Sequence, residues 1–257
     1  MTAVARTLYD KIGHGYAAAR EPDPAVAGAI RRALADARSV VNVGAGTGAY
    51  EPADLNVLAV EPSAVMLAQR PPQAAPAVRA AAEALPLPDD SVDAAMAVLS
   101  DHHWGDRAAG LRELRRVARR RVVLFNADPA EAERFWLTTE YLPAFLDLIP
   151  PPYRRPGYWE AELVELLGPL RVEPVPIRHD CRDGFYGAYW RRPAAYLESR
   201  VRAGISVFAR LPEHAVAQAV RALKADLASG SWQSRHAELL TLDDLDLGYR
   251  AVVAELA

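Results

Sequence analysis

The sequence predicts an α/β fold built on a doubly wound, mostly parallel sheet, with a helical N-terminal segment and a helical cap insertion. Val40–Val43 is a short run rich in β-branched residues, typical of a buried strand, and it leads directly into a glycine-rich stretch, Gly44–Gly48. Similar apolar runs follow at Val57–Val60, Ala94–Leu99 and Val122–Phe125. Buried runs of this kind, separated by helical patterns, are typical of parallel strands covered on both faces.

Length and composition limit the alternatives. The 257 residues suit one domain, 1–257, and with 51% hydrophobic and 25% charged residues the chain can bury a large core. A net charge of -3 argues against a dedicated nucleic-acid binder. Cys181 is the only cysteine, which excludes an intramolecular disulfide, and no run of about 20 apolar residues exists. We expect a cytoplasmic protein, a monomer or homodimer, with no membrane or nucleic-acid partner.

Residues 1–38 are expected to form a helical cover in front of the core. Tyr9, Ile12, Tyr16 and Arg20 have roughly helical spacing, although glycines interrupt it. Residues 25–38 form a clear amphipathic pattern, which predicts a helix.

The glycine-rich stretch and the next strand predict a ligand site. Glycine lacks a Cβ, so the backbone can turn tightly and approach a ligand. Glu61 follows the second strand, where a carboxylate can accept hydrogen bonds from ribose hydroxyls. Only eight residues separate Gly48 from Val57, which is short for a parallel crossover. We therefore expect a single helical turn there.

Further along, residues 82–93 contain a Leu-Pro-Leu-Pro-Asp-Asp turn, Asp101-His102-His103-Trp104 follows the next strand, and residues 112–117 form an Arg-rich helix. In this order, the blocks from Val40 to Phe125 resemble the class I S-adenosylmethionine-dependent methyltransferases, in particular small bacterial enzymes that act on small molecules. The chain departs from the family pattern at Asn42 and Ala45, and it lacks the usual Pro-Gly-Gly turn after the Arg-rich helix.

The resemblance implies S-adenosylmethionine as cofactor, with S-adenosylhomocysteine as product, and no metal. It implies a donor site on the glycine stretch, the acid after the second strand and the ends of the next strands. The implied contacts are Gly44, Ala45, Gly46, Gly48, Glu61, Pro62, Ala82, Glu83, Ala84, Leu99 and Ser100, with Tyr16 and Arg20 at the donor's carboxylate.

The acid–base assignment is open. His102 and His103 follow a core strand at the sheet edge where such folds bind ligands, and histidine suits proton transfer near neutral pH. Asp101, Tyr9 and Tyr16 are rival candidates, and positioning without any base is a further alternative.

The remaining residues are expected to build the acceptor side. The nucleoside-binding core is 39–126, a lid insertion spans 127–170, and 171–257 adds strands and helices that complete the sheet and the acceptor site. Aromatic and acidic residues in the last two parts are candidates to contact the substrate: Trp136, Glu140, Tyr141, Asp183, Phe185 and Tyr186. The mixed His, Cys and Asp residues at 179–183 lack the spacing of a metal site.

The arginine cluster Arg119–Arg121 can be interpreted in two ways. The arginines could form a nucleic-acid patch, but we favour the solvated last turn of a helix.

The expected function is methylation of a small aromatic or heteroaromatic metabolite on carbon, nitrogen or oxygen, as in natural-product tailoring. The alternatives are a nicotinamide-dependent oxidoreductase and a non-catalytic S-adenosylmethionine-binding protein.

Overall fold

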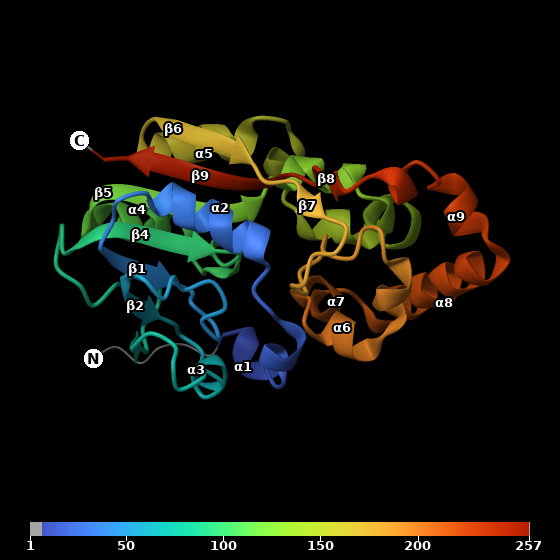
Figure 1. The fold of residues 1–257 in the computed structure, drawn as a ribbon, viewed down its shortest axis with the longest axis horizontal. Helices are drawn as coiled ribbons and strands as arrows, with labels where there is room; N and C mark the ends of the chain where they lie inside the picture. Colours follow the sequence, from blue (N-terminus) through green and yellow to red (C-terminus); the bar gives the residue numbers. More distant parts are fainter. Residues whose placement is uncertain (1–6, 257) are drawn as a thin grey trace.

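The computed structural model describes residues 7–256, without the side chains of residues 18 and 19, and its centre is a seven-stranded sheet (Figure 1). The strand order is β3-β2-β1-β4-β5-β9-β6. The first five strands in this order are mutually parallel, and β9 runs antiparallel to both β5 and β6. The strands are β1 (Ser39–Val43), β2 (Asn56–Val60), β3 (Ala77–Val78), β4 (Val92–Val98), β5 (Ala118–Ala127), β6 (Leu170–Pro174) and β9 (Tyr249–Glu255). The predicted doubly wound, mostly parallel fold is confirmed.

The α-helices divide between the layers of the sheet and a separate helical end of the molecule. They are α1 (Tyr9–Ile12), α2 (Pro24–Leu34), α3 (Ala64–Leu67), α4 (Arg107–Val117), α5 (Tyr158–Leu167), α6 (Ser199–Ala203), α7 (Ser206–Arg210), α8 (Glu213–Ser229) and α9 (Ser231–Arg235). Short 3₁₀ segments and one π turn, Leu137–Tyr141, fill most of the chain between β5 and α5. Helix α2 begins at a capping residue, Asp23, whose carboxylate accepts from two free backbone N–H groups.

Two apolar cores lie on opposite faces of the sheet. Along β4 the residues alternate: Met96 packs into the core covered by α2, while Ala95 packs into the core covered by α4 and α5. Both residues are fully buried. Because neither face of β4 meets water, nearly all of its residues are apolar and the strand appears in the sequence as one continuous apolar run.

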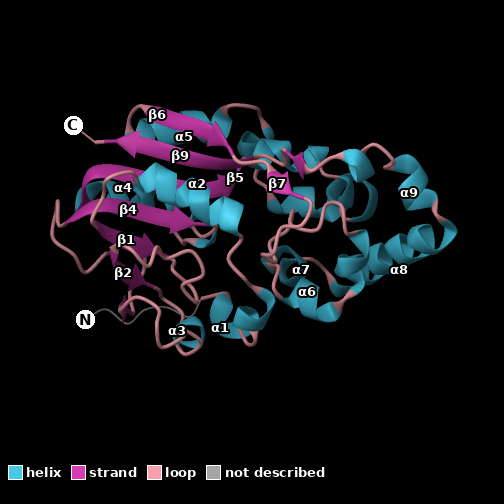
Figure 2. Ribbon diagram, in the orientation of Figure 1, coloured by secondary structure: helices cyan, strands magenta, loops and turns pink. Residues whose placement is uncertain are grey.

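The carboxyl ends of the parallel strands face the helical end of the molecule. The arrows of β1 and β4 point toward α6 and α7 in Figure 1, and Figure 2 shows only helices and loops beyond most of the strand ends. Strand order changes direction between β1 and β4, which are neighbours in the sheet but not in the sequence. In open α/β sheets this switch point is where ligands bind.

Two predictions about helices are wrong. The chain between Gly48 and β2 forms turns and contains no helical turn, because proline and the short span leave no room for one. The helix predicted over 25–38 ends at Leu34, before the left-handed Ala35 (φ 47°). After β6 the chain forms a separate short ladder of β7 (Ile177–Arg178) with β8 (Asp244–Leu245). A 3₁₀ segment, Pro193–Leu197, then leads into α6 and α7.

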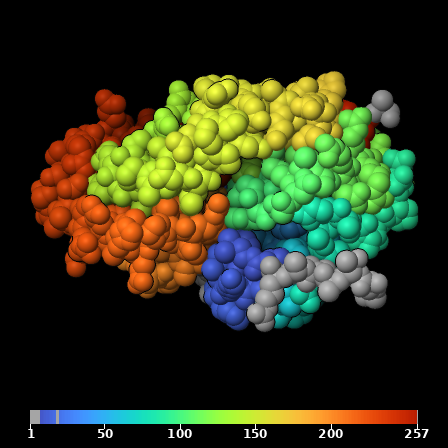
Figure 3. Space-filling model, turned by 180° about the vertical axis from the view of Figure 1, so that it is seen from behind, coloured from blue at the N-terminus to red at the C-terminus, as the bar shows by residue number. Residues whose placement is uncertain are grey.

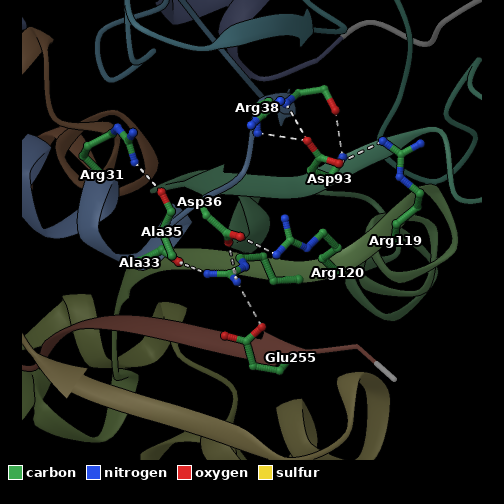
Figure 4. Close-up of polar contacts among 11 residues, drawn as sticks. Arg31, Ala33, Ala35, Asp36, Arg38, Asp93, Arg119, Arg120 and Glu255 are labelled. Carbon is green, nitrogen blue, oxygen red and sulfur yellow. Dashed lines mark hydrogen bonds and ion pairs between the residues drawn. The ribbon is translucent and has the colours of Figure 1, made fainter.

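The arginine cluster Arg119–Arg121 lies on β5, so its assignment to the last turn of a helix is wrong. In Figure 4 the guanidinium groups of Arg119 and Arg120 face carboxylates. The pairs are Arg119 with Asp93 (2.9 Å), Arg120 with Asp36 (2.5 Å), and Arg121 with Asp36 (3.2 Å) and Glu255 (3.5 Å). This pairing leaves little net positive charge for a phosphate backbone.

Candidate functional site

Two adjoining cavities lie where the parallel strands end. The first, which we call the donor cavity, has a volume of about 390 Å³ and lies over the ends of β1, β2 and β4. The second, the acceptor cavity, has a volume of about 370 Å³ and lies between the end of β5, the 3₁₀ segments after it, and α7. Volumes of this size suit small ligands. The two cavities share five wall residues: Tyr9, Tyr16, Arg20, Leu99 and His103.

The floor of the donor cavity is the predicted glycine turn. Gly44 and Gly46 have left-handed backbones, with φ of 69° and 54°. A Cβ on Gly44 would lie 2.6 Å from the Cβ of Ser100, which no side chain can accommodate. The Gly44 and Ala45 N–H groups donate to the Val60 carbonyl, so the turn is held against the end of β2. The backbone therefore reaches the cavity wall because these positions have no side chain.

Glu61 lies in the same wall, next to the turn. The Gly46 N–H donates to its Oε2 and the Ser63 N–H to its Oε1, each at 2.8 Å. Burial raises the pKa of this carboxyl, although both N–H groups oppose the rise. Each carboxylate oxygen keeps a lone pair that can accept from a ligand hydroxyl. Pro62, Ala82 and Glu83 line the cavity as well.

These features fit an adenosyl group. The carboxylate of Glu61 offers two acceptors for a ribose diol, and the glycine backbone allows close approach. Nearby, the indole Nε1 of Trp104 is a buried donor with no hydrogen-bond partner among residues 7–256. A nucleoside in this cavity would bring acceptor atoms to that wall.

Arg20 and Tyr16 lie at the junction of the two cavities, held by a buried ion pair. The Arg20 guanidinium donates from Nη2 to Asp183 Oδ2 at 2.7 Å, from Nε to the second oxygen, and from Nη1 to the Tyr16 hydroxyl. Tyr50 also donates to Asp183, at 2.8 Å. Burial alone would lower the Arg20 pKa, but Tyr16 and Asp183 hold it well above its usual value. Asp183, predicted to contact the substrate, lies outside the lining of both cavities and instead orients Arg20 through these hydrogen bonds.

His103 also borders both cavities. Its Nε2 lies 3.2 Å from the Tyr9 hydroxyl and 3.5 Å from Ser206 Oγ. Burial and the neighbouring His102 lower the pKa of His103 well below its usual value, whereas burial raises the pKa of Tyr9. At neutral pH the imidazole is therefore uncharged and can accept a proton, while Tyr9 keeps its own.

The preceding residues form a polar network in the acceptor wall. Buried Asp101 accepts from Arg107 Nε at 2.8 Å and from the Asn126 amide. The same amide nitrogen lies 3.1 Å from His102 Nδ1. Burial, followed by the charges of Arg210 and Arg107, lowers the pKa of His102 to about 4. With both oxygens of its carboxylate engaged, Asp101 is less available as a base than His103.

The rest of the acceptor cavity is largely apolar and aromatic. Its walls come from segments far apart in the sequence, which meet around a recess in Figure 3. The aromatic lining residues are Phe135, Phe145, Tyr153, Trp159, Phe185, Tyr186 and Tyr249. Phe185 and Tyr186, which the sequence analysis predicts as substrate contacts, line this cavity. Asn126, Ser206 and Arg210 were not predicted; only Asn126, near the end of a core strand, carried a usable signal.

Besides Asp183, five further predicted contacts lie outside the lining of both cavities. Trp136 is a core residue whose indole N–H donates to the Trp190 carbonyl, and the Tyr141 hydroxyl donates to Asp226. Glu140 pairs with Arg235 and His236 away from the cavities. Ala84 is exposed beyond the donor wall. Gly48 instead makes room for the Glu51–Arg70 ion pair, since a Cβ there would lie 2.9 Å from Glu51 Oε2.

Comparison with known proteins identifies the family. A family model described as a methyltransferase domain matches residues 41–125. The crystal structure of a candidate methyltransferase from an antibiotic biosynthesis pathway of Anabaena variabilis is 35% identical, with a TM-score of 0.81 over 93% of this chain and 99% of that one. The chain belongs to the class I S-adenosylmethionine-dependent methyltransferases.

Two more distant structures share only the fold with this methyltransferase. An S-adenosylmethionine-dependent methyltransferase from Thermotoga maritima is 20% identical, with a TM-score of 0.50 over 64% of this chain and 82% of that one. The [4+2]-cyclase SpnF is 17% identical, with a TM-score of 0.51 over 96% of this chain and 93% of that one. The search of curated proteins found no match.

Two further observations bear on partners and metals. Within residues 7–256, no helix has both the length and the apolar character needed to cross a bilayer. The same residues contain no cluster of three or more His, Cys, Asp or Glu side chains arranged to hold a metal ion.

Proposed function

We propose that this methyltransferase moves a methyl group from S-adenosylmethionine in the donor cavity to a small aromatic or heteroaromatic metabolite in the acceptor cavity. The observation that carries the proposal is the shared wall: Tyr9, Tyr16, Arg20, Leu99 and His103 border both cavities. Because the two cavities adjoin at these side chains, a ligand in each can bring a methyl group and its acceptor atom together there. Such positioning is a large part of catalysis.

The donor would be held by the residues already described. Glu61 would accept from the two ribose hydroxyls, and the Gly44–Gly46 backbone would lie under the amino-acid half of the donor. Arg20, oriented by Asp183, would face the donor's carboxylate, with Tyr16 beside it. The bound sulfonium supplies an activated methyl group: the carbon–sulfur bond breaks, its electron pair stays on sulfur, and the acceptor atom forms the new bond to carbon.

His103 is the proposed base. Its neutral imidazole would take the proton that the acceptor atom loses, and Tyr9 would orient the ring from across the junction. Because the lowered pKa makes His103 a weak base, the acceptor proton should be an acidic one. A phenol, an enol or a protonated amine meets this requirement.

Two observations support the substrate class. The aromatic residues of the acceptor wall favour a flat, apolar ring. The relative from Anabaena variabilis comes from an antibiotic biosynthesis pathway, which favours tailoring of a natural product.

The test has two stages. Calorimetric titration with S-adenosylhomocysteine should give saturable binding, and NADH should give none; the reverse result would favour an oxidoreductase. Incubation with S-adenosylmethionine and a panel of phenols, enols and aromatic amines should then give a methylated product by mass spectrometry. Donor binding without turnover on any member of a broad panel would support the non-catalytic alternative.

A further inference from the structure

The hydrogen-bond pattern around Asn126 determines which nitrogen of His102 carries its proton. The Asn126 side chain contacts the carboxylate of Asp101, which can only accept, so the contacting atom must be the amide nitrogen. Its Oδ1 accepts from the Ala127 N–H at 2.9 Å, which agrees with this orientation. The same amide nitrogen faces His102 Nδ1 at 3.1 Å. Nδ1 is therefore the acceptor, and neutral His102 carries its proton on Nε2.

Nε2 of His102 has no hydrogen-bond partner within residues 7–256, although the ring lines the acceptor cavity and more than a third of its surface is accessible. His102 thus offers the cavity an N–H donor. With its Nδ1 lone pair occupied by Asn126, this side chain is poorly suited to the role of base, and His103 keeps that role.

Two arginines line the same cavity with unused donors. Arg107 pairs with Asp101 and Glu162, but its Nη2 is buried without a hydrogen-bond partner among the described residues. Arg210, at the end of α7, has neither an ion-pair nor a hydrogen-bond partner within residues 7–256. Its charge acts on both His102 and His103, so it lies on their side of the cavity.

The acids of the cavity wall are already engaged. Asp101 accepts from Asn126 and Arg107. Asp128 caps the segment that follows it by accepting from the Ala130 N–H, and Glu131 pairs with Arg134 at 2.7 Å. Near the histidines the wall therefore combines a cation that lacks a carboxylate partner with two unused N–H donors.

We infer that the acceptor carries a carboxylate, bound by Arg210 and by the Nε2–H of His102. The inference rests on the proposed function and narrows its substrate class to aromatic or heteroaromatic carboxylic acids. Arg210 is then a residue that determines specificity. The carboxylate would fix the ring so that its acidic O–H or N–H group faces His103 and the donor methyl.

The test uses benzoate and its uncharged counterpart benzamide as probes, titrated by ligand-observed NMR. Wild-type protein should bind benzoate about tenfold more tightly than benzamide, because a charge-assisted hydrogen bond is worth about twice a neutral one. Arg210→Gln should lose about tenfold in benzoate affinity with no change for benzamide. Arg221→Gln is the matched control, since Arg221 is exposed on α8, is equally without a partner among the described residues, and lines neither cavity.

A second pair of variants tests His102. His102→Gln keeps an N–H donor and should retain most of the benzoate affinity, whereas His102→Phe should lose several-fold. The inference is overturned if wild-type protein shows no preference for benzoate, binds no benzoate at millimolar concentration, or keeps its preference in Arg210→Gln. These titrations need no donor, so failure of S-adenosylhomocysteine to bind would refute the proposed function separately.

Discussion

The donor and acceptor cavities are similar in size but are built in different ways. The donor wall is made mostly of backbone and short local segments that each follow a strand, such as Gly44–Gly46 after β1 and Glu61 after β2. The acceptor wall is made of side chains from the ends of β4 and β5, the 3₁₀ segments, α7 and the start of β9. The geometry of the first wall therefore follows from the strands themselves, whereas that of the second depends on how distant segments pack together.

This difference separates a shared chemistry from an individual specificity. Under the proposed function the donor is fixed, so a wall of turns and one carboxylate can hold it. An acceptor that varies from enzyme to enzyme needs a wall whose residues can change without disturbing the sheet, and loops on a rigid scaffold provide it.

The largest effect is expected in the donor wall. Glu61→Ala removes both acceptors for the ribose and should weaken S-adenosylhomocysteine binding about a thousandfold, since each charge-assisted hydrogen bond is worth about 1.5–3 kcal/mol. Glu83→Ala is the comparison variant: Glu83 is a second carboxylate in the same wall, it accepts from the Asp106 N–H at 3.0 Å, and its loss should weaken binding far less. Calorimetry measures both. Equal losses would mean that the cavity attracts the donor by its general charge, and that Glu61 has no special role.

The next largest effect is expected at the junction of the two cavities, where a substitution should lower the free energy of unfolding. Asp183→Asn leaves the buried guanidinium of Arg20 without its carboxylate and should lower the free energy of unfolding by about 3 kcal/mol. Asp180→Asn breaks the exposed pair with Arg178 and should cause little change. Urea denaturation of the two variants measures the difference. A similar, small loss for both would show that Arg20 does not depend on Asp183.

The two cavities also differ in how far the sequence could predict them. The donor wall was predictable because its residues are contiguous with their strands: a Val-rich strand, glycines that need positive φ, and an acid at the next strand end. Even there, Gly48 and Ala84 were misplaced, since a motif does not show which of its residues face the ligand.

The acceptor wall was predictable only in part. Trp136 and Tyr141 have the same helical spacing whether they pack in the core or line a cavity, and the structure places them in the core. Ser206 and Arg210 lie about a hundred residues from His103 in sequence, with no local pattern that joins them to it. Long-range packing decides such contacts, and one sequence does not record it.

Replacing the proposed base, which borders both cavities, should lower turnover far more than donor affinity. His103→Phe should lower kcat about 100-fold, the usual contribution of general base catalysis, while leaving S-adenosylhomocysteine affinity within about twofold of wild type. Tyr9→Phe, which keeps the ring and removes the hydroxyl that contacts His103, should cause a smaller loss. Single-turnover kinetics on an identified acceptor separates the two effects. A full-rate His103→Phe enzyme would leave positioning as the sole source of catalysis.

The smallest expected effect is a pH dependence of stability that comes from the acceptor wall. The pKa of His102 is about 4 in the folded chain against about 6.5 when unfolded, so the unfolded state binds more protons between these values. Stability is therefore fully present above about pH 6.5 and falls as the pH decreases toward 4. His102→Gln removes this titration and should lose less in Tm than wild type between about pH 7 and pH 5. His214→Gln, on the exposed surface of α8, serves as the control and should follow wild type. If His102→Gln also follows wild type, water that reaches the accessible part of the ring offsets its burial, and the N–H donor assigned to it would compete with water for its ligand.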